Sequence, residues 1–184
     1  MSDEIRKIGI LGGTGALGSA LTKKWTVKGY EILIGSRDPV KAQKIATQVN
    51  EELGVSNIQG LGLKAAARES DIAVLTVPYS SHADTLNLVK EDLKGKILID
   101  TTVPLQKIVT KAQLPTIGSS AMAAQTILGN EVEVVAALQN ISSHLVSSEE
   151  TIKAEVLVTG SNKGSAETVM SLLSCLGLKC WYAG

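Results

Sequence analysis

Aromatic side chains are scarce in this sequence. Its 184 residues include two tryptophans, three tyrosines and no phenylalanine, which leaves few rings on which nucleic-acid bases could stack. An excess of charge of one sign is also lacking, because 18 basic residues balance 18 acidic residues. A chain without net charge has no long-range field to attract nucleic acid or an anionic membrane. We therefore expect no nucleic-acid partner.

Long hydrophobic runs are missing as well, although 44% of the residues are hydrophobic. No apolar run approaches the roughly 18 residues of a membrane span, and residues 1–4 lack the basic and then apolar layout of a secretory signal. We expect no membrane partner and a cytoplasmic location.

Residues that bind metals are also few. Cys175 and Cys180 fit no paired metal-ligand spacing, and only His82 and His144 could add an imidazole. This composition excludes a structural zinc site. We expect both cysteines to act as small apolar core residues in a reducing compartment.

Apolar runs alternate with helix-length amphipathic stretches along the whole chain, without a linker or a break in composition. This order is typical of an α/β fold with a doubly wound, mostly parallel sheet, the Rossmann fold. We predict a single domain over residues 1–184. The expected strands are 7–12, 31–35, a weak one near Ile58, 71–77, 96–100, 132–138 and 155–159, and the expected helices are 15–28, 39–53, 64–69, 81–93, 119–128 and 165–176.

A glycine-rich turn lies between the first expected strand and the first expected helix. Residues 13–18 read GTGALG, the G-x-G-x-x-G pattern of dinucleotide-binding proteins. In that pattern Gly13 permits a tight turn, Gly15 lets the backbone approach a pyrophosphate, and Gly18 allows close helix–strand packing. The N–H groups at the helix start face the phosphates, and the Thr14 hydroxyl can add a donor. The alternative is a glycine turn with a structural role only.

The end of the second strand selects between the two nicotinamide dinucleotides, because an acidic residue there binds a ribose 2′-hydroxyl and repels a 2′-phosphate. Here Ser36 and Arg37 occupy that place, and Lys41 follows one helical turn later. A hydroxyl, a guanidinium and an ammonium suit a phosphate monoester, which favours NADP(H). Alternatively, Arg37 and Lys41 are ordinary solvated charges with Asp38 as their partner.

The expected strand ends at 76–78, 101–104 and 140–143 carry small neutral residues, and a second ligand of a doubly wound sheet lies beyond such ends. The nicotinamide half should therefore meet Thr76. No tyrosine is followed four residues later by lysine, and no nucleophile with an adjacent base presents itself, so we expect no catalytic side chain. We interpret His82 and His144 as surface residues, and Asp84 and Asp100 as partners of turn amides.

Four segments carry a resemblance to a known family: GILGGTGALGSAL at 9–21, IGSRDPVKA at 34–42, DIAVLTVPY at 71–79 and VMSLLSCLGLKCWYAG at 169–184. Together with the SAMAAQ stretch at 120–125, they resemble the F420-dependent NADP reductases. The resemblance implies cofactors NADP and F420, or a flavin in its place, between which a hydride passes directly. Members of that family continue through further helices beyond the position of Gly184.

The resemblance also implies site residues. By position, NADP would be held by Gly13, Thr14, Gly15, Ala16 and Leu17, its 2′-phosphate by Ser36, Arg37 and Lys41, and the deazaflavin ring near Val103 and Ser143. Two alternatives stay open: a different NADP-dependent reductase, and a non-catalytic NADP-binding sensor or subunit completed by another chain. A homo-oligomer is possible in each case.

Overall fold

The computed structural model describes residues 6–105, 114–148, 152 and 154–184. Its strands are β1 (Lys7–Leu11), β2 (Glu31–Ser36), β3 (Ile58–Gly62), β4 (Ile72–Leu75), β5 (Ile97–Asp100), β6 (Glu133–Ala136), β7 (Glu155–Gly160) and β8 (Lys179–Tyr182). Its helices are α1 (Ala16–Thr26), α2 (Pro39–Leu53), α3 (Leu63–Glu69), α4 (His82–Val89), α5 (Ser120–Leu128), α6 (Ser143–Ser147) and α7 (Lys163–Ser174), with short 3-10 helices η1 (Tyr79–Ser81) and η2 (Glu91–Leu93).

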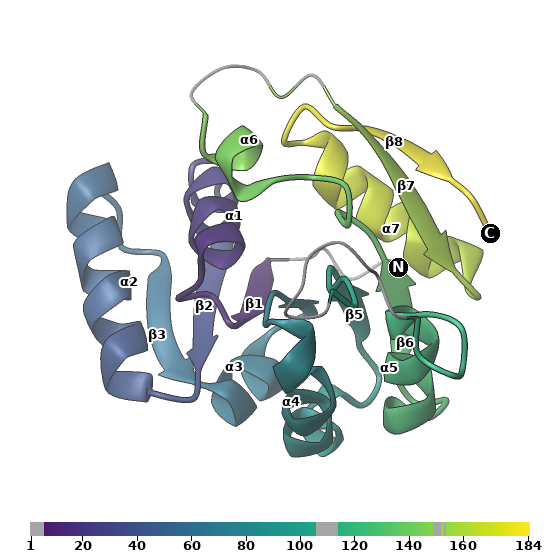
Figure 1. Cartoon of the computed structure of the whole chain (residues 1–184). Coiled ribbons are helices and arrows are strands. Elements are labelled where there is room, and N and C mark those ends of the chain that lie inside the picture. Colours follow the sequence, from purple (N-terminus) through teal and green to yellow (C-terminus); the bar gives the residue numbers. More distant parts are fainter. Residues whose placement is uncertain (1–5, 106–113, 149–151, 153) are drawn as a thin grey trace.

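The strands form one sheet in the order β3-β2-β1-β4-β5-β6-β7-β8. Neighbouring strands are parallel except β6 and β7, which are antiparallel. Helices cover both faces, with α1, α2, α6 and α7 on one side and α3, α4 and α5 on the other (Figure 1). The predicted doubly wound, mostly parallel α/β sheet is confirmed.

The order of the strands creates a switch point between β1 and β4. From β1 the chain moves outward through β2 to β3, and it then returns through α3 to β4 on the other side of β1. Loops at the carboxyl ends of β1 and β4 therefore lead to opposite faces of the sheet. In open α/β sheets such a divergence leaves the crevice in which ligands bind.

Each face of the sheet has its own core. In β1, Ile8 and Ile10 pack with the helices α1, α2 and α7, whereas Leu11 packs with α3 and α4. Strand side chains alternate between faces, and both faces here are apolar because both are covered by helices.

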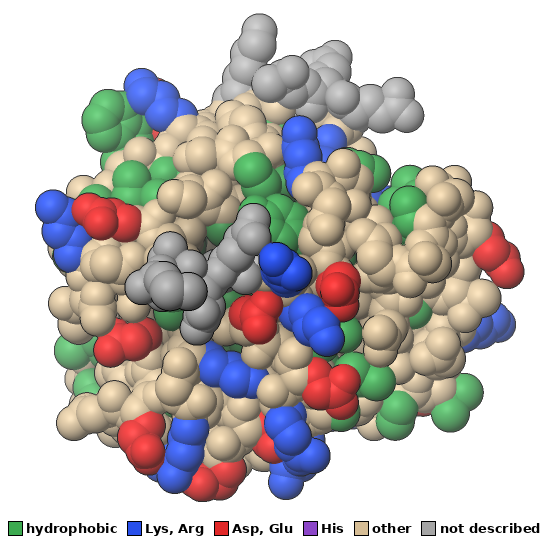
Figure 2. Space-filling view, turned by 180° about the vertical axis from the view of Figure 1, so that it is seen from behind, with side chains coloured by type: hydrophobic (Ala, Val, Ile, Leu, Met, Phe, Trp, Pro, Cys, Tyr) green, Lys and Arg blue, Asp and Glu red, His purple; other side chains and the backbone are tan. Residues whose placement is uncertain are grey.

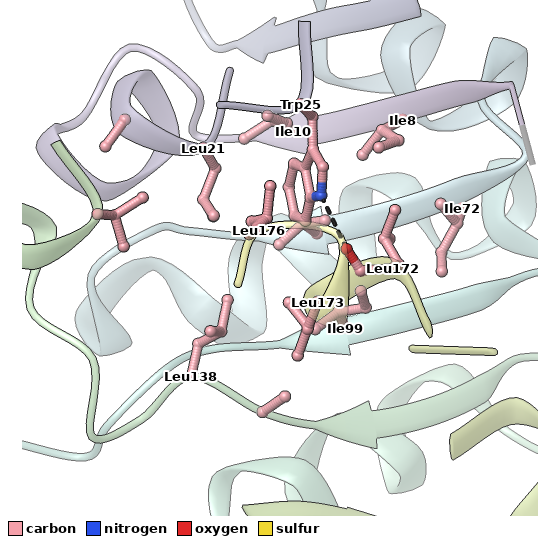
Figure 3. Close-up of a cluster of buried hydrophobic side chains, with 14 of the residues drawn as sticks. Ile8, Ile10, Leu21, Trp25, Ile72, Ile99, Leu138, Leu172, Leu173 and Leu176 are labelled. Carbon is pink, nitrogen blue, oxygen red and sulfur yellow. Dashed lines mark hydrogen bonds between the residues drawn. The ribbon is translucent and has the colours of Figure 1, made fainter. Parts of the chain in front are cut away.

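Trp25 on α1 is fully buried and packs among side chains from β1, β4, β5 and α7 (Figure 3). Its indole N–H donates a hydrogen bond of 3.2 Å to the carbonyl oxygen of Leu172 on α7. This contact joins the first helix of the chain to the last one.

Helix α2 begins and ends as the sequence indicates. The Asp38 side chain accepts a hydrogen bond from the Lys41 N–H, Pro39 occupies the first turn, and Gly54 ends the helix with a φ of 66°. The helix lies against β3 at Gly60, where an added Cβ would approach the Ala42 carbonyl carbon to 2.2 Å. The cap at Asp38 fixes the start of α2 close to the end of β2.

The bounds of the expected elements agree with the structure within two residues, apart from one helix, and two elements were not predicted. The strand expected at 71–77 ends at Leu75, since Pro78 cannot continue a ladder of hydrogen bonds. One further bond follows the strand, from the Thr76 N–H to the Leu11 carbonyl oxygen at 2.8 Å. The helix expected at 81–93 is divided into α4 and η2. The elements α6 and β8 were not predicted, because such short segments have only weak periodicity.

Charges of both signs lie side by side on the face shown in Figure 2, so that face has no field of a single sign. Among the described residues, no helix combines the length and the apolar composition needed to cross a bilayer.

Candidate functional site

The glycine turn joins β1 to α1. Gly12 has a φ of +91° and its N–H donates to the Gly35 carbonyl oxygen at 2.8 Å, which ties the turn to the end of β2. We expected Gly13 to permit the tight turn, and Gly13 lies within it, with its N–H donating to the Ile10 carbonyl oxygen at 3.0 Å, while Gly12 before it adopts the conformation that favours glycine. Gly13 is needed for space, because a Cβ there would lie 3.0 Å from the Ile10 carbonyl oxygen.

The two following glycines differ in what surrounds them. A Cβ at Gly18 would lie 2.6 Å from the Gly13 Cα and 2.8 Å from the Thr76 hydroxyl oxygen, so this glycine allows α1 to pack closely on the turn. A Cβ at Gly15 would meet only the Gly12 carbonyl oxygen, at 3.4 Å. Gly15 is exposed with an ordinary φ of −85°, so the space beside it is open.

The N-terminus of α1 has no side-chain cap at Gly15. Within the described part of the chain, the N–H groups of Ala16 and Leu17 have no hydrogen-bond acceptor. Free N–H groups at a helix start, together with the positive end of the helix dipole, bind anions.

A cleft of about 480 Å³ opens beside this turn, within the size range of ligand sites. The glycine turn, the end of β2, the start of α2, and the segment from the end of β4 into α4 form its walls. Its lining residues are Gly12, Thr14, Gly15, Ser36, Arg37, Asp38, Lys41, Leu63, Thr76, Val77, Pro78, Ser81 and Thr85.

Two cations line this cleft without a protein partner. Arg37 and Lys41 are exposed, and in the described residues neither side chain forms an ion pair or a hydrogen bond. The Asp38 carboxylate instead accepts a hydrogen bond from the Lys41 backbone N–H at 3.0 Å. The backbone N–H of Asp38 donates to the Ser36 hydroxyl oxygen at 3.1 Å. The cations are thus available to an anionic ligand.

The cleft brings together six of the predicted site residues, Thr14, Gly15, Ser36, Arg37, Lys41 and Thr76. Gly13, Leu17 and Val103 are absent from its lining, and Val103 lies half-buried beyond the end of β5. Ala16 and Ser143 line a separate cavity of about 340 Å³ between α1 and α6. The structure therefore groups the expected phosphate-binding residues more closely than the two residues expected near a deazaflavin.

His82 was expected on the surface, and this was wrong. Its side chain is 3% exposed and its Nε2 lies 3.1 Å from Oδ2 of the fully buried Asp100. The other Asp100 oxygen accepts from the backbone N–H of Thr102, as expected of a strand-end aspartate, at 2.9 Å. His144 is exposed, as predicted, and Asp84 lies exposed in the first turn of α4.

The sequence carried one signal for this buried pair. Asp100 ends the apolar run KILID, and a carboxylate on a buried strand needs partners. That signal does not identify His82 as the partner of Asp100, because the pairing depends on how α4 packs against β5.

No group of three or more metal-ligating side chains occurs among the residues that the structure describes. Burial raises the pKa of the Cys175 thiol and of the Cys180 thiol. A raised pKa leaves both as thiols rather than nucleophilic thiolates at neutral pH.

The fold, the glycine turn and the cleft at the switch point define a Rossmann-type dinucleotide-binding protein of the α/β class. Residues 7–104 match the family model described as "NADP oxidoreductase coenzyme F420-dependent", and the chain belongs to this family.

Two relatives and one solved structure illustrate the similarity. The F420-dependent NADP reductase of Methanothermobacter thermautotrophicus is 35% identical over 176 residues, which cover 91% of this chain and 76% of the relative. That of Methanocaldococcus jannaschii is also 35% identical, over 90% of this chain and 78% of the relative. The crystal structure of a putative F420-dependent NADP reductase from Arthrobacter sp. FB24 has a TM-score of 0.80 at 23% identity, covering 97% of this chain and 85% of that chain, and it shows the same fold.

Proposed function

We propose that this protein transfers a hydride between NADP(H) and a deazaflavin of the F420 type. The observation that carries the proposal is a pair of cations, Arg37 and Lys41, which have no partner among the described residues and lie with Ser36 in the cleft that begins at the glycine turn. Both relatives described above are named F420-dependent NADP reductases. Membership of this family does not favour a non-catalytic sensor or an unrelated reductase.

The residues present fit NADP. The N–H groups of Ala16 and Leu17 would hold the pyrophosphate, with Gly15 leaving room for its approach. Arg37 and Lys41 would bind the 2′-phosphate by charge-assisted hydrogen bonds, and Ser36 would add a hydroxyl. Gly15, Ser36, Arg37 and Lys41 line one cleft, and Ala16 and Leu17 follow Gly15 directly at the start of α1, so a single extended dinucleotide could reach all of these groups.

The nicotinamide end of the dinucleotide would meet Thr76 at the end of β4. The Thr76 hydroxyl donates to the Leu11 carbonyl oxygen at 3.1 Å, which holds this wall against β1. We place the second flat ring, from F420 or a flavin, near Val103 and Ser143, after the ends of β5 and β6.

The reduced dinucleotide, when bound, supplies the hydride. The protein's own residues bind and orient the two cofactors and exclude water, because positioning accounts for much of the rate of such a transfer. The carboxylate in the cleft lining belongs to Asp38, which caps α2.

An assay with purified protein tests this function. NADPH should be oxidised when F420 is added, and NADH in its place should give a much slower reaction. A parallel reaction with FMN shows whether a flavin substitutes for F420. Tight NADPH binding without oxidation by either acceptor would contradict the proposed transfer and favour a sensor.

Three further predictions from the sequence belong to this proposal: one NADP-binding domain over residues 1–184, a cytoplasmic location, and a possible homo-oligomer. Limited proteolysis would test the first, because a single domain should yield no stable fragment of intermediate size. Native mass measurement would test the last.

A further inference from the structure

Asp100 connects the carboxyl ends of two strands with the start of α4. Its Oδ2 lies 3.1 Å from the His82 Nε2, its Oδ1 accepts from the N–H and the hydroxyl of Thr102 at 2.9 and 2.7 Å, and its carbonyl oxygen accepts from the Gln139 amide at 2.8 Å. His82, Thr102 and Gln139 belong to α4, to the segment after β5 and to the segment after β6. One buried residue thus fixes three segments relative to one another.

A neighbouring hydrogen bond brings β4 into the same network. The Thr101 hydroxyl donates to the Leu75 carbonyl oxygen at 2.8 Å, so the end of β4 is held to the end of β5. Both side chains of the His82–Asp100 pair are almost fully buried. Buried polar networks whose members are satisfied are rigid, because each broken contact leaves an unpaired group in a low-dielectric interior.

The network lies directly behind one wall of the cleft. Pro78 and Ser81 line the cleft just before His82 in the chain, and Thr85 lines it one helical turn after His82. The His82 ring also lies 5.3 Å from the Tyr79 ring, measured between centroids, within the intervening η1. His82 itself is not part of the lining, so it supports the wall from inside the protein.

We propose that His82 and Asp100 are a positioning pair that fixes this wall, and that the pair thereby holds the nicotinamide end of NADPH at reacting distance. This inference rests on the proposed function. Hydride transfer is sensitive to such support, because a misplacement of about 1 Å can cost roughly 100-fold in rate. None of the hydrogen bonds described for Asp100 and Thr101 involves Arg37 or the glycine turn at the phosphate-binding end of the cleft.

The test compares two substitutions of the histidine. In His82→Gln the amide nitrogen can take the place of Nε2 and keep a donor for Asp100, whereas His82→Leu removes the donor. We expect His82→Leu to slow single-turnover hydride transfer to F420 at least about tenfold, with NADPH affinity changed less than about threefold. His82→Gln should recover most of the rate.

A control separates positioning from loss of stability. Val169 is fully buried on α7 and takes no part in the cleft lining, so Val169→Ala destabilises the fold at a distance. At a temperature where every variant is folded, Val169→Ala should transfer hydride at the wild-type rate. An equal slowing in Val169→Ala and His82→Leu, or a wild-type rate in His82→Leu, would overturn the proposal.

A binding measurement makes the test independent of the acceptor. The nicotinamide ring of NADPH is fluorescent, and its anisotropy at saturating protein reports how firmly the ring is held. We expect lower anisotropy with His82→Leu than with wild type, and recovery with His82→Gln; unchanged anisotropy in His82→Leu would overturn the positioning role. Failure of wild type to reduce F420 or FMN would instead count against the proposed function. If His82→Leu does not fold, His82→Asn serves, because its shorter amide cannot reach Asp100.

Discussion

The indole N–H of Trp25 and the carbonyl oxygen of Leu172 are 147 residues apart in sequence and 3.2 Å apart in the structure. This bond joins α1, which carries the glycine turn, to α7 beneath the last two strands. The Cys175 thiol also donates to this carbonyl oxygen, at 3.0 Å, but a thiol is a weak donor, so loss of the indole N–H removes the stronger of the two bonds. The stability of α1 and of the glycine turn before it therefore depends in part on α7.

Trp25→Phe should lower the free energy of unfolding by about 1–3 kcal/mol through the lost hydrogen bond and the space that the smaller ring leaves, and Trp25→Ala by about 3–5 kcal/mol through the larger cavity. Urea unfolding measures both values. Trp181→Phe is the matched control, because Trp181 is 48% exposed and should lose less than about 1 kcal/mol. Similar losses at the two tryptophans would contradict the role assigned to Trp25.

Arg37→Ala should weaken NADPH binding at least about tenfold, because a charge-assisted contact to phosphate contributes about 1.5–3 kcal/mol. NADH, which lacks the 2′-phosphate, should bind as before. Calorimetry with both dinucleotides measures the difference.

Lys44→Ala is the control for Arg37. It removes a positive charge from the same region on α2, but Lys44 does not line the cleft. An equal loss for NADPH and NADH in Arg37→Ala, or a comparable loss in Lys44→Ala, would show that Arg37 does not recognise the 2′-phosphate.

Local patterns predicted the elements whose ends carry their own signals. Asp38, Pro39 and Gly54 mark the two ends of α2, and the structure has the helix between them. By contrast, β8 is a four-residue strand at the edge of the sheet whose pairing with β7 depends on α7 bringing the chain back. Its short segment carries too little periodicity to be recognised alone.

The candidate site likewise has features that local sequence patterns predicted and features that depend on tertiary packing. The order of glycines and the residues after the second strand could be recognised because a fixed local geometry needs them. The burial of His82 could not be predicted, since it depends on Asp100, 18 residues away on another element. The positive φ of Gly12 likewise could not be predicted, because the sequence does not reveal which of two adjacent glycines adopts it.

Gly15→Val should abolish NADPH binding without unfolding the protein. The backbone at Gly15 is extended and an added Cβ meets one atom at 3.4 Å, so the fold tolerates the side chain, which would occupy the space of the pyrophosphate. Gly18→Val is the contrasting variant, since its Cβ would lie 2.6 Å from the Gly13 Cα, and it should unfold at lower urea. Near-wild-type NADPH affinity in Gly15→Val would refute the placement of the pyrophosphate.

Cys175 and Cys180 should react slowly with a thiol reagent in the folded protein. Burial raises the pKa of each thiol, so the reactive thiolate forms only at higher pH than in the unfolded chain. Reaction with Ellman's reagent should be faster in urea than in the native protein. The rate should also rise with pH in both states, and the pH range of this rise should be higher for the native protein. A fast native reaction at neutral pH would instead indicate a thiol with a functional role.

Val103→Trp should suppress hydride transfer while leaving NADPH affinity unchanged, because the half-buried Val103 follows β5 where we place the second ring. An indole there would prevent that ring from stacking at reacting distance, and misplacement of about 1 Å already costs roughly 100-fold. Leu105→Trp is the control, since Leu105 is 52% exposed two residues further on and should retain the wild-type rate. Single-turnover kinetics with NADPH and F420 separates the transfer step from binding, and calorimetry supplies the affinity. If Val103→Trp transferred hydride as fast as Leu105→Trp, the second ring would have to lie elsewhere, and the cavity between α1 and α6 that includes Ser143 would become the next place to test.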